Sequence, residues 1–143
     1  KFAGPLVFMV ASGCSSTVMV TLSGNFGRLT PPSCLYKATS SLAISSGDLT
    51  FDAKGNASAV FIIQIASTLT TTSGRKVILS GGASASNIFW KVGSSATFGT
   101  TSVFKGTVIA MESITFNTGA TLDGRGLART GAVTLAGNTI VKQ

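Results

Sequence analysis

The sequence predicts an all-β protein built as a β-solenoid. Strand-like alternation of apolar and polar residues recurs along the chain, beginning with residues 17–23. Similar segments return at intervals of 18 and 19 residues, aligned on Thr97-Phe98, Thr115-Phe116 and Thr134-Leu135. No helical period of useful length is present, and the helix formers Glu, Gln, Lys and Arg are scarce. This pattern favours stacked coils, in which each coil buries the inward residues of the next.

Each predicted element follows from its local pattern. Alternation or apolar character predicts strands over residues 17–23, 35–46, 48–52, 59–65, 76–80 and 87–93, with a turn region at 24–33. The segment 59–65 is apolar on both faces apart from Gln64, so a buried central strand is expected there. Two coils are expected near 97–114 and 115–133, with four inward side chains, Phe98, Phe116, Leu122 and Leu135.

Composition excludes several classes of function. The chain has 143 residues, enough for one domain with a core, and its net charge is +7. Its basic residues are scattered without interleaved aromatics, so no nucleic-acid partner is expected. No segment reaches the roughly 20 apolar residues of a membrane span. The simplest explanation of the charge is solubility, and attraction to acidic polysaccharide or to an anionic cell surface is the alternative.

The residue types that commonly catalyse reactions are also scarce. The chain has no histidine, which removes the main ingredient of hydrolytic triads and of common transition-metal sites. Asp48 and Asp52 are two of only four acidic residues, and they form either a carboxylate pair or two solvated turn residues. We therefore predict a protein that is not an enzyme and that has no catalytic residues, metal or cofactor.

Three features indicate export. Cys14 and Cys34 are the only cysteines, and a lone pair in a Ser- and Thr-rich chain predicts one disulfide, with two buried thiols as the alternative. Asn56 begins an Asn-Ala-Ser tripeptide in a predicted turn and is a candidate glycosylation site. Residue 1 is Lys rather than Met, so a processed chain is expected. The expected location is extracellular or at the cell surface.

Three long segments carry a resemblance to a known family. Residues 59–71 (AVFIIQIASTLTT), 87–110 (NIFWKVGSSATFGTTSVFKGTVIA) and 113–140 (SITFNTGATLDGRGLARTGAVTLAGNTI) resemble the secreted ice-binding-like β-solenoid family. Residues 8–27 are more weakly similar to the first strands of that family. The resemblance implies an irregular, right-handed β-solenoid of triangular section.

The sequence departs from the family in two places. The family carries a long α-helix after its first strands, and here residues 24–29 run directly into 30–41 without it. The loss of a covering helix is expected to expose apolar surface. An additional apolar segment, KFAGPLVFMV, stands at the start of the chain. We therefore divide the chain into an extension, residues 1–13, and a domain, residues 14–143.

The extension suggests a first hypothesis for function, an extracellular structural subunit. In this hypothesis an N-terminal strand enters a neighbouring copy by donor-strand complementation, and head-to-tail repetition gives a homopolymeric fibril. The strand would use Phe2, Leu6, Val7, Phe8, Met9 and Val10. Insertion of the strand into its own domain is the rival arrangement.

The alternative hypothesis is an ice-binding or ice-adhesion protein. Ice recognition requires a flat, regular array of small hydroxyl and methyl groups. The candidate face comprises Thr97, Thr115, Thr118, Thr121, Thr134 and Thr139, and two bulky side chains, Lys91 and Lys105, threaten its flatness. A carbohydrate-binding or surface-adhesion module is the third reading.

Overall fold

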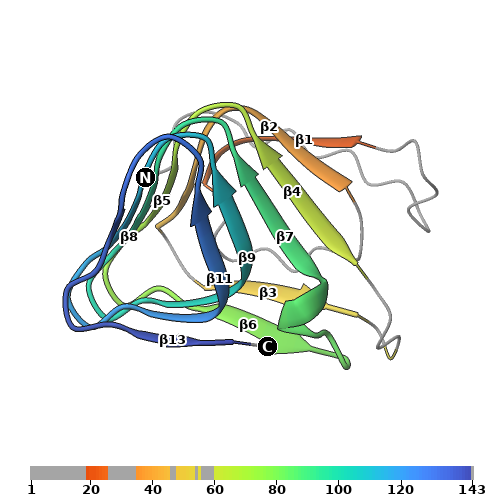
Figure 1. Cartoon of the computed structure of the whole chain (residues 1–143). Helices are drawn as coiled ribbons and strands as arrows, with labels where there is room; N and C mark the ends of the chain where they lie inside the picture. Colours follow the sequence, from red (N-terminus) through yellow and green to blue (C-terminus); the bar gives the residue numbers. More distant parts are fainter. Residues whose placement is uncertain (1–18, 26–34, 46–47, 54, 56–59, 143) are drawn as a thin grey trace.

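The described part of the chain is all-β, as predicted. The computed structural model describes residues 19–25, 35–45, 48–53, 55 and 60–142 (Figure 1). Within these ranges the helical structure is one short 3-10 turn, Ala85–Asn87, and no α-helix occurs. The strands are β1 Met19–Asn25, β2 Leu35–Ile44, β3 Leu49–Asp52, β4 Phe61–Ile65, β5 Leu69–Thr71, β6 Val77–Ser80, β7 Ile88–Val92, β8 Ala96–Phe98, β9 Val103–Ala110, β10 Ile114–Phe116, β11 Thr121–Ala128, β12 Val133–Thr134 and β13 Thr139–Val141.

All strand pairs are parallel and fall into three stacks, visible side by side in Figure 1. Face A contains the first half of β2, then β4, β7 and the second halves of β9 and β11, with β1 at its edge. Face B contains the second half of β2, then β5, β8, β10 and β12. Face C contains β3, β6, the first halves of β9 and β11, and β13. From β2 onward, each strand therefore begins on a different face from the one on which the preceding strand ended.

The recurrence noticed in the sequence is the register of face B. Thr97 pairs with Thr115, and Thr115 pairs with Thr134, so one turn of the chain spans 18 and then 19 residues. The preceding turn is longer, because Thr70 pairs with Thr97. Parallel pairing places each residue above its counterpart, which repeats both the inward and the outward chemistry.

Aromatic side chains form the centre of the core. Their rings make a chain of contacts with centroids 4.5 to 5.7 Å apart, in the order Phe61, Phe51, Trp90, Phe104, Phe98, Phe116. The indole N–H of Trp90 donates to the Lys105 carbonyl oxygen at 3.0 Å, so this buried polar group is satisfied. The rings come from all three faces, and they join the faces into one core.

Three of the four side chains predicted to point inward are buried, and one is not. Phe98, Phe116 and Leu122 are at most 1% exposed. Leu135 is 54% exposed, which corrects the prediction. It follows β12, the last strand of face B among the described residues, and no other described strand pairs there to cover it. Its place at the end of the stack, rather than its local pattern, leaves it open.

The prediction of a buried central strand at residues 59–65 is right about its place within the sheet and wrong about the burial of its outer surface. Phe61, Ile63 and Ile65 of β4 are buried, but Ile62 is 37% exposed. β4 is central within its sheet, since it pairs with β2 and β7, but only its inner surface lies against the core. The outer surface of face A is open in the described structure.

Glycine permits the sharpest bend. β9 and β11 each cross from face C to face A at one residue, Gly106 with φ 111° and Gly124 with φ 150°. A Cβ on Gly124 would lie 2.1 Å from the Gly106 carbonyl oxygen, so neighbouring coils stack closely there. Only glycine combines this backbone conformation with so short an approach.

The corner after face B repeats a left-handed residue in successive coils. Gly74, Gly119 and Gly137 have φ between 64° and 75°, whereas Thr101 has φ 57° at the equivalent place. A β-branched residue in this conformation is strained by about 1–2 kcal/mol. Thr101 is therefore the strained residue at this corner, because the equivalent positions in the other coils are glycine.

Replacing Thr101 by glycine should stabilise the protein. The relieved strain of about 1–2 kcal/mol exceeds the entropic cost of glycine, about 0.5–1 kcal/mol, so we expect the free energy of unfolding to rise by about 0.5–1 kcal/mol. Denaturant unfolding measures it. Thr100→Gly, next to the corner and without a positive φ, is the control and should destabilise. Equal losses in both variants would contradict the strain.

Tyr36 should make stability depend on alkaline pH. The ring is fully buried in β2, and burial raises the pKa of its hydroxyl above the ordinary value. The unfolded chain then loses the phenolic proton first, so stability is complete below about pH 10 and falls as the pH rises further. Denaturant unfolding at about pH 9 and about pH 11 should show the fall, while Tyr36→Phe should lessen it. A wild type and variant with identical alkaline slopes would exclude this origin.

Candidate functional site

The threonines predicted for one face lie in two stacks and a corner. Thr97, Thr115 and Thr134 are in register on face B, on the outward side. Thr121 and Thr139 are in register on face C. Thr118 lies in the turn after β10, where its carbonyl oxygen accepts from the N–H of Thr101. The six residues therefore do not form one surface.

Face B contains an outward threonine that the sequence prediction missed. Thr70 of β5 pairs with Thr97, so the central column runs through Ala43, Thr70, Thr97, Thr115 and Thr134. The alignment of 18- and 19-residue repeats did not reach Thr70, because the turn that separates it from Thr97 is longer. The signal was present in the Leu-Thr-Thr of β5, which matches the Ala-Thr-Phe of β8.

Two flanking columns widen this surface into an array. On one side stand Ser41, Thr68, Ser95, Ser113 and Ala132, and on the other Ser45, Thr72, Gly99, Asn117 and Ala136. Every member of the three columns is small and uncharged. Neighbouring strands in a sheet are about 4.8 Å apart, and alternate residues along a strand about 6.7 Å apart, so these groups repeat in two directions.

Hydrogen bonds between hydroxyl groups fix part of the array. The Thr68 Oγ1 hydroxyl donates to Ser41 Oγ at 2.7 Å, and the hydroxyl oxygens of Ser95 and Ser113 are 3.1 Å apart. Below the surface, the Thr71 hydroxyl oxygen accepts from the Gly99 N–H at 3.0 Å. The flanking hydroxyls are thus held by neighbouring coils rather than left to rotate.

The charged side chains that threatened the flatness of the array are on other faces. Lys91 pairs with Gln64 on the outer side of face A, and Lys105 pairs with Asp123 on face C. The Lys105 ammonium lies 3.4 Å from an Asp123 carboxylate oxygen. Faces A and C therefore carry long charged groups, whereas the outward strand positions of face B carry none among the described residues.

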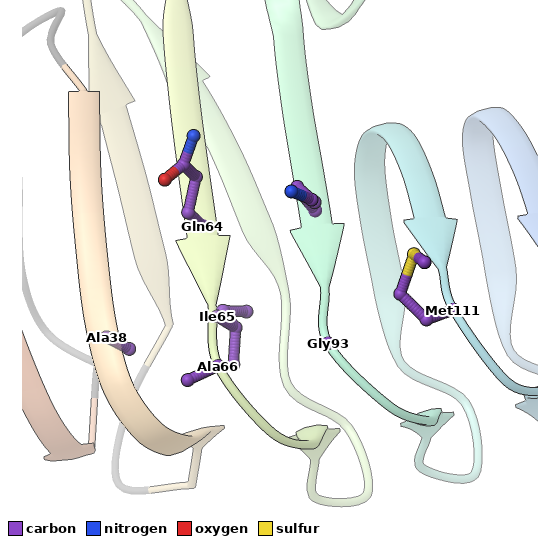
Figure 2. Close-up of a pocket in the computed structure, with 7 residues that line it drawn as sticks. Ala38, Gln64, Ile65, Ala66, Gly93 and Met111 are labelled. Atoms are coloured by element: carbon purple, nitrogen blue, oxygen red, sulfur yellow. The ribbon is translucent and has the colours of Figure 1, made fainter.

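A shallow groove of about 340 Å³ lies at one end of face A. Ala38, Ala66 and Gly93 make it possible by their small size, and Gln64 and Met111 stand on either side of Gly93 (Figure 2). Lys91 is the one ionisable residue in its lining. Nothing in this lining forms a nucleophile, acid or base arrangement.

Asp48, one of the two acidic residues considered as a carboxylate pair, has structural contacts. Asp48 accepts from the Lys76 backbone N–H at 3.0 Å and lies 3.8 Å from the Arg75 guanidinium, which links β3 to β6. No cluster of three metal-ligating side chains occurs among the described residues. Within the same ranges, no helix has the length and hydropathy needed to cross a bilayer.

Several predicted sites lie outside the described residues and stay predictions. These are the strand residues Phe2, Leu6, Val7, Phe8, Met9 and Val10, the cysteines Cys14 and Cys34, and Asn56. The division between residues 1–13 and 14–143 also falls in this part of the chain.

The profile of the ice-binding-like family matches residues 8–141. The chain belongs to the ice-binding-like family. An ice-binding protein of Nostoc sp. strain HG1 is 43% identical over 117 residues, covering 81% of this chain and 43% of the relative. One from Colwellia is 43% identical over 118 residues, covering 82% of this chain and 45% of the relative. The chain thus spans less than half the length of these relatives.

Solved structures agree with this assignment. The crystal structure of an ice binding protein from an Antarctic biological consortium is 68% identical with a TM-score of 0.85, covering 94% of this chain and 59% of that one. The ice-binding protein domain of Shewanella frigidimarina is 32% identical with a TM-score of 0.86, covering 92% of this chain and 56% of that one.

The comparisons overturn the expected fibril function. The relatives and the structural neighbours given above are named ice-binding proteins. This favours the alternative hypothesis, an ice-binding protein, over a self-assembling, homopolymeric subunit. The fibril hypothesis depended on the apolar character of residues 1–11, which the structure does not describe, on the missing family helix and on the absence of catalytic residues. It gave no reason for the uncharged array of face B, a feature that a polymerising strand does not require.

Proposed function

We propose that the chain binds ice through face B. The observation that supports this most is the set of three outward columns, in which every residue is Ala, Ser, Thr, Gly or Asn. Ice presents a periodic lattice of oxygen atoms, so its recognition needs groups that are themselves periodic. The stacked strands of face B supply that periodicity, and its small side chains keep the surface level.

Threonine suits this role because it combines rigidity with two kinds of contact. Its β-branch restricts χ1, so a column of threonines holds its methyl and hydroxyl groups in a repeated orientation. The hydroxyl bonds to a surface water, and the methyl occupies the space between neighbouring waters. On a mobile side chain, both contacts would require the side chain to lose rotamer entropy when it binds.

The proposed recognition needs a rigid frame, and we propose that the frame is an irregular right-handed β-solenoid of triangular section. Support comes from three parallel stacks joined by corners and from the aromatic core that contacts all of them. The solenoid is irregular because the coil from Thr70 to Thr97 is longer than the coils from Thr97 to Thr115 and from Thr115 to Thr134.

The proposed activity is non-enzymatic and extracellular. Binding to a growing crystal requires no bond to be made or broken, so face B needs neither an acid nor a base. Ice that forms outside the cell is accessible only to an exported or surface-held protein. Ice is therefore the proposed partner, with no cofactor.

Thr115→Tyr should abolish the shaping of ice crystals and remove most of the thermal hysteresis. The ring would rise from the centre of the array and hold the neighbouring columns away from the lattice. The control is Thr121→Tyr, which places the same ring on the half-buried outward side of face C. Crystal growth in a nanolitre osmometer measures both effects.

The design separates the two threonine stacks. We expect Thr121→Tyr to retain the wild-type crystal habit and hysteresis. If Thr121→Tyr abolishes activity and Thr115→Tyr does not, face C rather than face B binds ice. If the wild type shows neither hysteresis nor shaping at high concentration, the proposed function is wrong.

A further inference from the structure

Face A exposes a patch of apolar side chains. Ile62 and Phe89 share one outward column, and Ile109 and Leu127 share the next. Their exposed fractions are 37%, 38%, 38% and 51%. The patch therefore spans four neighbouring strands, β4, β7, β9 and β11, on one side of the molecule (Figure 1). Exposed apolar side chains gathered on one face in this way mark an interaction site more often than a bare surface.

The charges interleaved with this patch are all positive. On face A, the outward positions of the four strands are Ile62, Gln64, Phe89, Lys91, Thr107, Ile109, Arg125 and Leu127. Lys91 stands in the column of Ile109 and Leu127, and Arg125 in the column of Phe89. No carboxylate occupies an outward position of these strands on face A, since Asp123 of β11 lies on face C. The two described ion pairs, Arg75–Asp48 and Lys105–Asp123, belong to face C.

The groove adds a polar recess to the same surface. Its lining includes Gln64, Lys91 and Met111 together with the small residues Ala66 and Gly93. Lys91 supplies a cation and Gln64 an amide donor, while Met111 supplies an apolar wall. An anionic headgroup in this groove would meet hydrogen-bond donors, with apolar side chains beside it for the chain attached to the headgroup.

We propose that face A binds an anionic lipid surface. The boundary of a bilayer offers phosphate charges at one depth and acyl chain at the next, which matches a flat face that mixes half-exposed apolar side chains with cations. The net charge of +7 adds long-range attraction to such a surface. A soluble polyanion would satisfy Lys91 and Arg125, but it would leave Phe89, Ile109 and Leu127 in water.

This site is independent of ice binding. Face A and face B share strand β2 but use different halves of it, and their outward residues differ throughout. A molecule held to lipid through face A would still present face B. Lipid binding therefore does not rest on the proposed function of face B, and a variant of either face leaves the other unchanged.

The test is co-sedimentation of the full 143-residue chain with vesicles. Vesicles of phosphatidylcholine with phosphatidylglycerol are compared with pure phosphatidylcholine. The face A variant is Ile109→Ser with Arg125→Ser. The matched control is Ile78→Ser with Lys76→Ser on face C, which makes the same two changes of residue class at a 41% exposed isoleucine and an exposed cation. Circular dichroism checks that both variants fold.

We expect binding only to the vesicles that contain phosphatidylglycerol. Removing one cation should weaken it about fivefold, and removing one half-exposed isoleucine about threefold to sevenfold. The face A variant should therefore bind at least tenfold more weakly, while the face C control should lose only about fivefold, from its charge alone. Thr115→Tyr should bind vesicles as the wild type does.

Three results would overturn the proposal. One is no binding at millimolar phosphatidylglycerol. Another is an equal loss in the face A and face C variants, which would indicate attraction by net charge without a site. The third is binding to a soluble acidic polysaccharide that depends on Arg125 while vesicles are ignored, which would make the occupant a carbohydrate.

Discussion

The parallel register between successive coils is the constraint on which the rest of the structure depends. Backbone hydrogen bonds hold Ile114 above Ala96 and Thr115 above Thr97, and so fix which side chains face inward. A slip of one residue would exchange every inward side chain with an outward one and would place Phe98 or Phe116 in water. The aromatic contacts inside and the threonine column outside are therefore two consequences of a single alignment.

The flatness of face B depends on the interior beneath it. The rings of Phe98 and Phe116 stack with centroids 4.9 Å apart, close to the distance between neighbouring strands. A larger or smaller inward residue in one coil would raise or lower the threonine above it, because the interior is close-packed. Surface periodicity in this domain is thus a property of the core as much as of the outward side chains.

The sequence alone predicted the repeating part of the fold and only part of the candidate site. Thr97, Thr115 and Thr134 could be aligned because their coils have nearly equal length, whereas Thr70 lies one longer turn away. Thr121 was grouped with them because a period gives position along the coil but not the corner that separates two faces. That corner lies at Thr101, Gly119 and Gly137, in the turns that follow the strands of face B.

Corners also let the three faces carry different chemistry at little cost to folding. An outward side chain such as Leu127 is largely accessible before and after folding, so its identity changes stability much less than that of Leu122 inside. An exposed apolar residue lowers solubility, whereas surface charges of one sign oppose self-association. The cations beside the apolar patch of face A therefore offset the loss of solubility, and they also select a partner of opposite charge. The same coil can therefore hold a neutral face for a crystal and a charged, apolar face for another surface.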